Sequence, residues 1–214
     1  MPGNVAGVLL AAGEGSRLGE PKAQIVIGGQ SLARRGIVML QDGGADPVIV
    51  VTGATGPELP DVNGVGSSSG DTGLAGVITV HNPAWRTGMG SSLAAGLRAV
   101  PAACTAAVLA LADQPLVGQE AVRRIIGAHA DGAGVVVACY AGRPRNPVLI
   151  AREHWAEVLQ LAAGDVGARP FLAARAELVT LVECGDTGRP DDIDTPEDLA
   201  RIKGLLAGSA SFPN

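Results

Sequence analysis

A segment near the N-terminus, LLAAGEGSRLGEPK at residues 9–22, combines closely spaced glycines with two basic side chains. Glycine permits positive φ and close backbone approach, so successive N–H groups of such a loop can converge on phosphate oxygens. Arg17 and Lys22 add full positive charges to those dipoles. Because a charge-assisted hydrogen bond contributes roughly 1.5–3 kcal/mol, two of them can decide whether a triphosphate binds. The loop predicts a phosphate site in which Arg17 and Lys22 are catalytic candidates.

The spacing of these glycines separates the loop from two familiar phosphate-binding motifs. Its pattern is GxGxxxG, one residue longer than the GxGxxG fingerprint of dinucleotide-binding folds, and the chain contains no GxxxxGK[ST] P-loop. A glycine-rich loop alone fits a structural turn equally well. The additional Arg17, Pro21 and Lys22 favour a ligand site.

Asp113 follows the apolar run AAVLALA, which places it at the carboxyl end of a predicted strand. Open α/β sheets bind their ligands at that end. Mg²⁺ prefers one or two carboxylates and keeps water and phosphate oxygens around it, so Asp113 is a candidate magnesium ligand and catalytic residue. The alternative is a capping or turn role before Pro115.

The elements that would position these residues follow from the hydrophobic pattern. Short aliphatic runs alternate with amphipathic segments, as in strand–helix units around a largely parallel sheet. Strands are predicted at residues 5–11, 47–52, 76–81, 106–112, 134–141, 146–150 and 177–183. Helices are predicted at residues 31–42, 90–99, 118–130, 153–162, 167–175 and 195–207. Because only RPR separates the fifth and sixth strands, these should form a hairpin, and the sheet should be mixed.

Length and composition bound the domain organisation. The 214 residues can bury one core, so we expect a single domain at residues 1–207 and a flexible tail at 208–214. Residues 53–75 are rich in Gly, Ser, Pro and Asp and should form a surface loop that contributes nothing to the core. Three widely spaced cysteines without a CxxC pair indicate core thiols rather than a disulfide framework or a zinc site.

The net charge limits the classes of partner that the protein can bind. A net charge of −5 argues against a nucleic-acid or anionic-membrane surface, since either requires a basic field. No run of about 18 apolar residues occurs, and the start MPGNVAGVLL lacks the basic flank of a signal peptide. We therefore expect a cytoplasmic protein whose anionic ligands are held by local cations.

These motifs together resemble a known family. LAAGEGSRLGEPK is similar to the LAAGxxxRxGxPK signature of MobA-like NTP transferases, especially the branch of molybdenum cofactor cytidylyltransferases. The resemblance continues, in order along nearly the whole chain, through NPAWRTGMGSSLAAGL, LADQP, RPRNPVLI, GDVGAR and DIDTPEDL. It implies a three-layer α/β/α sandwich, a Rossmann-like nucleotidyltransferase fold with a mostly parallel mixed sheet.

The resemblance also implies an activity and a donor site: Mg²⁺-dependent transfer of a nucleotidyl group from a nucleoside triphosphate, with release of pyrophosphate. Ala12, in LAAG rather than LAGG, points to CTP. Magnesium would be held by Asp113 and by Asp194. Asp191 and Asp192 are the other candidates for this second ligand, and Asp194 could instead cap the last helix. The implied nucleotide-binding residues are Leu10, Ala11, Ala12, Gly13, Gly15, Ser16, Arg17, Lys22, Ser92 and Asp113.

The acceptor implied by the resemblance is molybdopterin, the molybdenum cofactor, or a related phosphorylated small molecule. Its phosphate would meet arginines of the later motifs, with Arg143, Asn146 and Arg169 as the acceptor-binding set and Arg86 and Arg145 as further candidates. The chain departs from the family here, because Arg145 and Asn146 replace a Gly-His pair. The loop at residues 60–75 could border the same pocket.

Two alternatives from other functional classes stay open. One is an oxidoreductase that binds a flavin or NAD(P)H on the same fold, since some MobA-like sequences carry oxidoreductase names. The other is a carrier or chaperone that delivers molybdenum cofactor to a partner molybdoenzyme. The GxGxxxG spacing disfavours the first, and the retained Lys22, Asp113 and Asp194 disfavour the second.

Overall fold

A seven-stranded sheet runs through the centre of the computed structural model, which describes residues 4–56, 59, 62 and 74–209. The strand order is β5-β4-β1-β6-β8-β7-β9, and a separate two-stranded hairpin has the order β2-β3. Their bounds are β1 Asn4–Ala11, β2 Val26–Ile27, β3 Gln30–Ser31, β4 Val48–Thr52, β5 Val77–His81, β6 Cys104–Leu111, β7 Val135–Tyr140, β8 Arg143–Ala151 and β9 Val179–Glu183.

The sheet is mostly parallel and mixed, as predicted. β1 pairs in parallel with β4 and β6, β4 with β5, and β7 with β9, whereas β8 runs antiparallel to both β6 and β7. Because β8 follows β7 through a short hairpin, it has no room for a crossover and must reverse its direction. The carboxyl ends of β1 and β6 therefore lie next to each other at one edge of the sheet.

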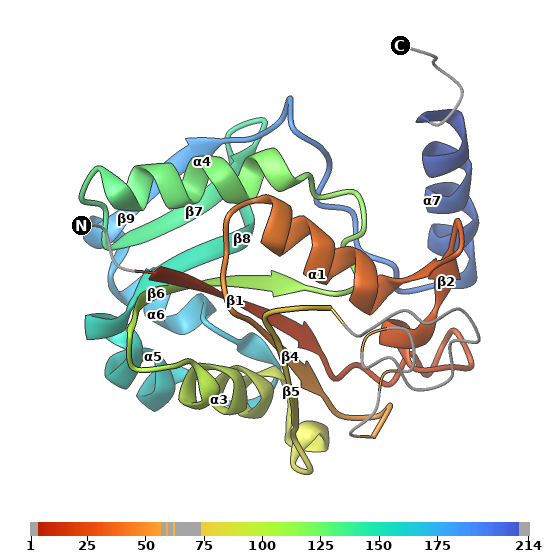
Figure 1. Cartoon of the computed structure of the whole chain (residues 1–214), viewed down its shortest axis with the longest axis horizontal. Coiled ribbons are helices and arrows are strands. Elements are labelled where there is room, and N and C mark those ends of the chain that lie inside the picture. Colours follow the sequence, from red (N-terminus) through yellow and green to blue (C-terminus); the bar gives the residue numbers. More distant parts are fainter. Residues whose placement is uncertain (1–3, 57–58, 60–61, 63–73, 210–214) are drawn as a thin grey trace.

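Helices cover both faces of this sheet (Figure 1). The main helices are α1 Leu32–Asp42, α3 Met89–Ala99, α4 Gln119–Ala130, α5 Trp155–Leu161, α6 Arg169–Ala174 and α7 Pro196–Ser209. α1 and α4 pack on one face, where Leu40 and Ile125 join the core cluster that contains Leu9 of β1. α3, α5 and α6 pack on the other face around Val8 and Phe171. The three-layer α/β/α architecture is thereby confirmed.

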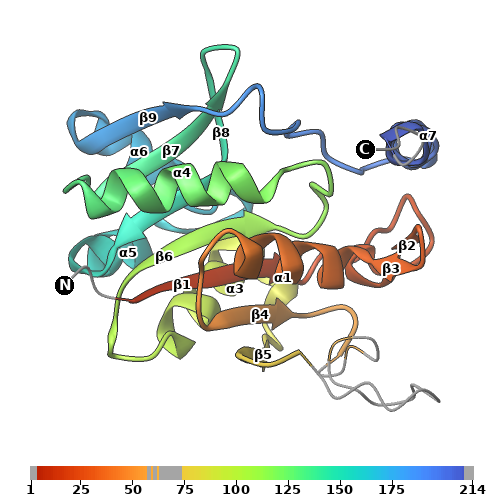
Figure 2. The same ribbon diagram turned by 45° about the horizontal axis from the view of Figure 1, so that its top comes forward.

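The C-terminal helix α7 stands apart from these layers and lies beside the β2–β3 hairpin (Figure 2). A small apolar cluster joins them, with Ile202 of α7 and Ile193 packed against Ile25, Ile27 and Leu32. The hairpin itself was not predicted, because strands of two residues leave no hydrophobic period to read. Its packing ties the segment after Lys22 to the segment that precedes α7.

Three sequence predictions need correction or lie outside the described residues. The β7–β8 hairpin forms, but its turn is at Ala141 and Gly142, so the RPR segment belongs to β8. Most of the loop at residues 53–75, and of its part at 60–75, lies outside the described residues. Leu59 and Val62 are nevertheless buried in the core, so the expectation that this segment contributes no core side chain was wrong.

The remaining predictions concern the tail, the cysteines and membrane contact. α7 continues through Ser209, two residues beyond the predicted domain end, and residues 210–214 are outside the described part of the chain. The three cysteines are free and buried, as expected for core thiols. Within residues 4–56 and 74–209, no helix combines the length and the apolar character needed to cross a bilayer.

Candidate nucleotide site

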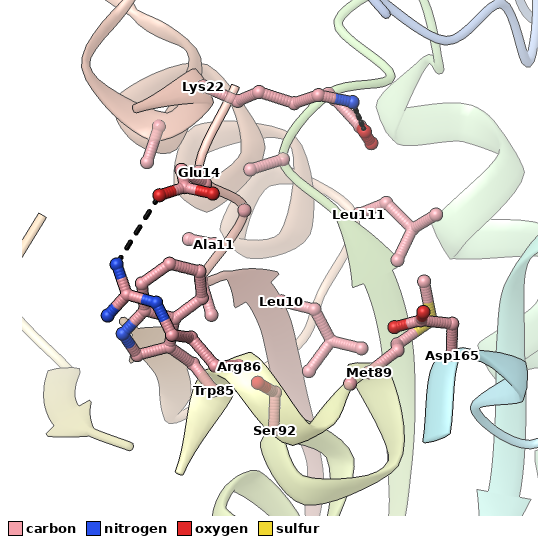
Figure 3. A pocket seen from close by; sticks show the side chains of 16 residues that line it. Leu10, Ala11, Glu14, Lys22, Trp85, Arg86, Met89, Ser92, Leu111 and Asp165 are labelled. Carbon is pink, nitrogen blue, oxygen red and sulfur yellow. Dashed lines mark hydrogen bonds and ion pairs between the residues drawn. The ribbon is translucent and has the colours of Figure 1, made fainter. Parts of the chain in front are cut away.

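A pocket of about 500 Å³ opens at the carboxyl ends of β1 and β6 (Figure 3). Its lining comes from four segments: the end of β1 with the following loop, the end of β6, the turn before α3 with the start of α3, and the turn before α6. The lining residues are Leu10, Ala11, Ala12, Gly13, Glu14, Lys22, Ala23, Trp85, Arg86, Gly88, Met89, Ser92, Leu111, Ala112, Asp113 and Asp165. The location matches the ligand-binding edge of open α/β sheets.

The glycine-rich loop folds back so that Lys22 returns to the strand it left. Gly15 has a φ of 63°, and a Cβ at this position would collide with the carbonyl oxygen of Glu20, so only glycine fits this turn. The amide of Leu18 donates to the carbonyl of Gly15 at 2.7 Å, and the amide of Lys22 donates to the carbonyl of Gly13 at 3.3 Å. The loop thereby directs the Lys22 side chain into the pocket.

Lys22 lies between two carboxylates that are far apart in sequence. Its Nζ donates to Asp113 Oδ2 at 2.7 Å and to Asp194 Oδ1 at 2.6 Å. Burial opposes the charge on Lys22, but attraction to Asp113 and Asp194 outweighs it, so the pKa of this ammonium is raised above its ordinary value. Lys22 is therefore a fixed cation at neutral pH, and it draws both predicted metal ligands to one point.

The structure separates the three aspartates that competed in the DDIDTP motif. Asp191 pairs with Arg189 at 2.9 Å and with Arg201 at 2.8 Å, and Asp192 accepts a hydrogen bond from Gln114 at 2.8 Å. Asp194 alone of the three contacts Lys22.

The capping alternative for Asp194 is not what the structure shows. In the described residues, the start of α7 is capped by a reciprocal contact between Thr195 and Asp198. The Asp198 amide donates to Thr195 Oγ1 at 3.2 Å, and the Thr195 amide donates to Asp198 Oδ2 at 3.1 Å. The Asp194 side chain is left to face Lys22.

Asp113 and Asp194 fit a divalent cation by the chemistry of their donor atoms. Two carboxylates that already converge on one ammonium group can share another cation, and Mg²⁺ needs only one or two protein carboxylates when phosphate and water oxygens complete its shell. In residues 4–56 and 74–209, no three His, Cys, Asp or Glu side chains form a preassembled metal site. The geometry therefore suits an ion that arrives with phosphates.

The other predicted nucleotide contacts are only partly assembled in the pocket. Seven of the ten line it: Leu10, Ala11, Ala12, Gly13, Lys22, Ser92 and Asp113. Ser92 is buried, and its hydroxyl accepts a hydrogen bond from Asn82 at 3.1 Å. Gly15, Ser16 and Arg17 belong to the same loop but do not line the pocket, and Arg17 is exposed. Arg17 therefore lies on the exposed part of the loop, outside the pocket, and its catalytic role stays a prediction.

The predicted acceptor residues lie in two different places. Asn146 and Arg169 line a smaller cavity of about 60 Å³ that shares Leu10, Met89 and Leu111 with the main pocket. Arg143 and Arg145 are exposed at the β7–β8 hairpin and line neither cavity, because the pairing of β8 with β7 carries them to the turn. Arg143 therefore lies outside both cavities, and its contact with the acceptor stays a prediction.

Sequence reasoning missed eight residues that line the pocket: Glu14, Ala23, Trp85, Gly88, Met89, Leu111, Ala112 and Asp165. The Arg86 guanidinium lies 4.3 Å above the Trp85 ring centroid, and its Nη2 is 3.4 Å from Glu14 Oε1. Arg86, predicted as an acceptor contact, thus lies on the pocket wall with partners of its own. NPAWRTG and GDVGAR both matched the family signature, but only their arginines were selected as candidates.

The segment that carries Asp194 is held in place by close backbone packing against the loop after β6. A Cβ on Gly118 would collide with the carbonyl oxygen of Thr187, and the Arg189 amide donates to the Leu116 carbonyl at 2.9 Å. The Ile193 amide also donates to the Asp113 carbonyl at 2.9 Å. These contacts set the distance between the two carboxylates.

We expect Gly118→Ala to destabilise the protein by about 1–3 kcal/mol, because the methyl group must displace backbone rather than a flexible side chain. Gly127→Ala is the matched control: this exposed glycine inside α4 has no atom near its Cβ direction, so alanine should stabilise by up to about 1 kcal/mol. Urea unfolding of both variants measures the difference. Equal stabilities for the two would contradict the packing described above.

Fold and site together define a Rossmann-like α/β protein with a pocket at the carboxyl ends of its strands β1 and β6. A model described as the MobA-like NTP transferase domain matches residues 7–179, and the chain belongs to this family of nucleotidyltransferases.

Similar proteins agree with this assignment, although their names describe different activities. Nicotine blue oxidoreductase from Paenarthrobacter nicotinovorans is 32% identical over 206 residues, covering 92% of this chain and 96% of the relative. A probable molybdenum cofactor guanylyltransferase from Opitutus terrae is 43% identical over 47 residues, which are 22% of this chain and 23% of that protein. The structure of Rv0371C from Mycobacterium tuberculosis H37Rv, a complex with manganese, is 25% identical, covers 94% and 98% of the two chains, and has a TM-score of 0.70.

Proposed function

We propose that this protein transfers CMP from CTP, as its Mg²⁺ complex, to a phosphorylated small-molecule acceptor, with molybdopterin the favoured acceptor. The observation that carries the proposal is Lys22 held between Asp113 and Asp194 in the pocket that the glycine-rich loop borders. Hydride or flavin chemistry gives this arrangement no purpose, whereas a triphosphate needs both a fixed cation and carboxylates that share a metal.

The proposed reaction is a displacement at the α-phosphorus. An oxygen of the acceptor phosphate forms a new P–O bond, the bond to the bridging α–β oxygen breaks, and pyrophosphate leaves with that electron pair. The attacking phosphate is already anionic, so no general base is required; catalysis depends on alignment and charge neutralisation. Asp113 and Asp194 would hold Mg²⁺, which neutralises phosphate charge and orients the leaving group. Lys22 would contact the triphosphate, and Arg17 would contact its outer phosphates from the exposed part of the loop.

The preference for CTP rests on the wall that carries Ala12. Ala12 and Trp85 both approach the backbone at Gly53, so a methyl group and an indole ring stand together beside the space for a base. The proposed base contacts are the backbone at Leu10 to Gly13 and the Ser92 hydroxyl. The proposed preference for cytosine therefore follows from Ala12, which adds a methyl group to this wall where LAGG would place none.

A thermal-shift panel of CTP, GTP, ATP and UTP, each with and without Mg²⁺, tests the donor. CTP with Mg²⁺ should raise the apparent stability most, since ligand at a hundredfold excess over Kd contributes about 2.7 kcal/mol. Pyrophosphate release with molybdopterin present tests the transfer. A protein that releases no pyrophosphate from any of the four triphosphates would overturn the proposal.

A second candidate function is a reductase that binds a flavin or NAD(P)H, and the 32% identity to nicotine blue oxidoreductase over nearly the whole chain favours it. The same panel extended with NADPH and FMN distinguishes the two. Stabilisation by NADPH or FMN, without an effect of CTP and Mg²⁺, would favour the reductase. In that case Asp113→Asn should leave ligand binding unchanged.

A further inference from the structure

One side of the pocket has no part in the chemistry proposed for the triphosphate. Met89, Leu111 and Asp165 form this side, across the pocket from Trp85, Arg86 and Glu14 (Figure 3). Within the described parts of the chain, the exposed Asp165 carboxylate has neither a hydrogen bond nor an ion pair. An unpaired carboxylate beside apolar walls has full hydrogen-bonding capacity to offer a ligand.

The position of Asp165 is fixed by backbone packing, not by contacts of its own side chain. Gly88 has a φ of 112°, and a Cβ there would collide with the carbonyl group of Gly164. Two residues later, a Cβ on Gly90 would lie 3.0 Å from the carbonyl oxygen of Ala162. The start of α3 and the turn that carries Asp165 therefore meet backbone to backbone, which fixes the backbone of Asp165 at the pocket wall and leaves its carboxylate oxygens free.

The pocket continues past this side into the smaller cavity. That cavity shares Leu10, Met89 and Leu111 with the main pocket and reaches Asn146 and Arg169. Its remaining walls are mostly apolar. A molecule that extended from Lys22 and Asp113 in this direction would meet aliphatic and thioether groups first, and polar groups at its far end.

We propose that Asp165 determines acceptor specificity by binding N–H donors at the end of the acceptor opposite its phosphate. This inference rests on the proposed transferase function and assigns Asp165 to one part of the favoured acceptor, the flat ring system of molybdopterin, in which an amino group lies next to a ring N–H. The two oxygens of an ionised carboxylate accept hydrogen bonds and donate none, so they match two adjacent N–H groups. The aliphatic walls at Leu10 and Leu111 suit the faces of such a ring, and the negative charge opposes a second anionic end.

The test compares Asp165→Asn with Asp131→Asn, an equal charge change on an exposed residue at the end of α4. The ligand is molybdopterin, whose Kd is measured by anaerobic equilibrium dialysis. Asp165→Asn should raise this Kd and the KM for molybdopterin roughly tenfold or more, because a charge-assisted contact becomes a weaker neutral one. The kcat at saturating molybdopterin and the thermal shift by CTP with Mg²⁺ should stay near wild type. Asp131→Asn should change none of these quantities.

Each other outcome has a distinct meaning. If the wild-type protein transfers CMP to molybdopterin and Asp165→Asn binds it equally well or more tightly, the inference is wrong and the proposed function stands. If Asp165→Asn instead weakens the thermal shift by CTP, Asp165 belongs to the donor site and the inference is again wrong. If the wild-type protein responds to CTP but binds no molybdopterin, both the assigned acceptor and this inference fail.

Discussion

Asp113→Asn should lower the rate of pyrophosphate release by at least about 10²–10³-fold, a loss typical of removing one electrostatic group from a reaction centre. Asparagine is nearly isosteric with aspartate, but its amide is neutral and is a weaker ligand for Mg²⁺ than a carboxylate. The substitution also leaves Lys22 with Asp194 as its only carboxylate. The effect should therefore appear in the Mg²⁺ dependence of the rate as well as in kcat.

Stability separates this catalytic effect from misfolding. The Asp113 side chain is 21% exposed, and Lys22 keeps one ion pair in the variant, so urea unfolding should remain cooperative with a midpoint close to wild type. Asp131→Asn controls for the loss of a negative charge. An Asp113→Asn enzyme that keeps Mg²⁺-dependent transfer within a few-fold of wild type would show that Asp113 is not a metal ligand.

The sequence identified Lys22 and Asp113 as separate candidates but not their contact. Lys22 follows the glycine-rich loop and Asp113 follows an apolar run, and both are local patterns. Their approach to 2.7 Å depends on β1 and β6 being neighbours in the sheet, and strand order is a property of long-range pairing. The contact could be predicted only through the family resemblance.

Asp194 shows a different limit of sequence reasoning. Three aspartates within four positions have the same chemistry, so composition cannot rank them. Arg189 and Arg201 engage Asp191, and Gln114 engages Asp192, which leaves Asp194 to face Lys22. Gln114 and Lys22 are distant from this motif in sequence, so no local pattern predicts which aspartate each of them contacts.

Arg143 and Trp85 show that the type of a residue does not fix where its side chain lies. Arg143 was placed in the acceptor set because arginines suit phosphates, yet strand pairing puts it at an exposed turn. Trp85 was passed over although its ring lines the pocket, since the direction of its side chain depends on the short turn before α3. Residue type indicates what a side chain can bind, whereas the local backbone decides whether the side chain reaches the site.

Lys22→Met should have two distinct effects, because Lys22 would contact the triphosphate and also binds the two carboxylates. Without the ammonium group, CTP loses a charge-assisted contact, and the rate of pyrophosphate release should fall about 10²–10³-fold. In the free protein, the same change removes the cation that Asp113 and Asp194 share, so the two carboxylates repel each other and the protein should lose about 1–3 kcal/mol of stability without metal.

Stabilisation by Mg²⁺ without nucleotide should change in the opposite direction in the Lys22→Met variant. In the wild-type protein, Mg²⁺ must compete with the Lys22 ammonium for the same two carboxylates, and the raised pKa of Lys22 means that this competitor stays charged throughout the neutral range. Lys22→Met removes the competitor, so Mg²⁺ without nucleotide should stabilise the variant more than it stabilises the wild type. Thermal unfolding over a Mg²⁺ titration, with and without CTP, measures both effects.

Lys203→Met provides the matched control, since Lys203 is the only other lysine of the chain and is exposed on α7. It should change neither the rate nor the response to Mg²⁺. A Lys22→Met protein with a normal rate, or one whose response to Mg²⁺ equals that of the wild type, would mean that Lys22 does not hold the two carboxylates in the way the structure shows. Weaker turnover together with a stronger response to metal is the result that only a shared site explains, because loss of folding would reduce both.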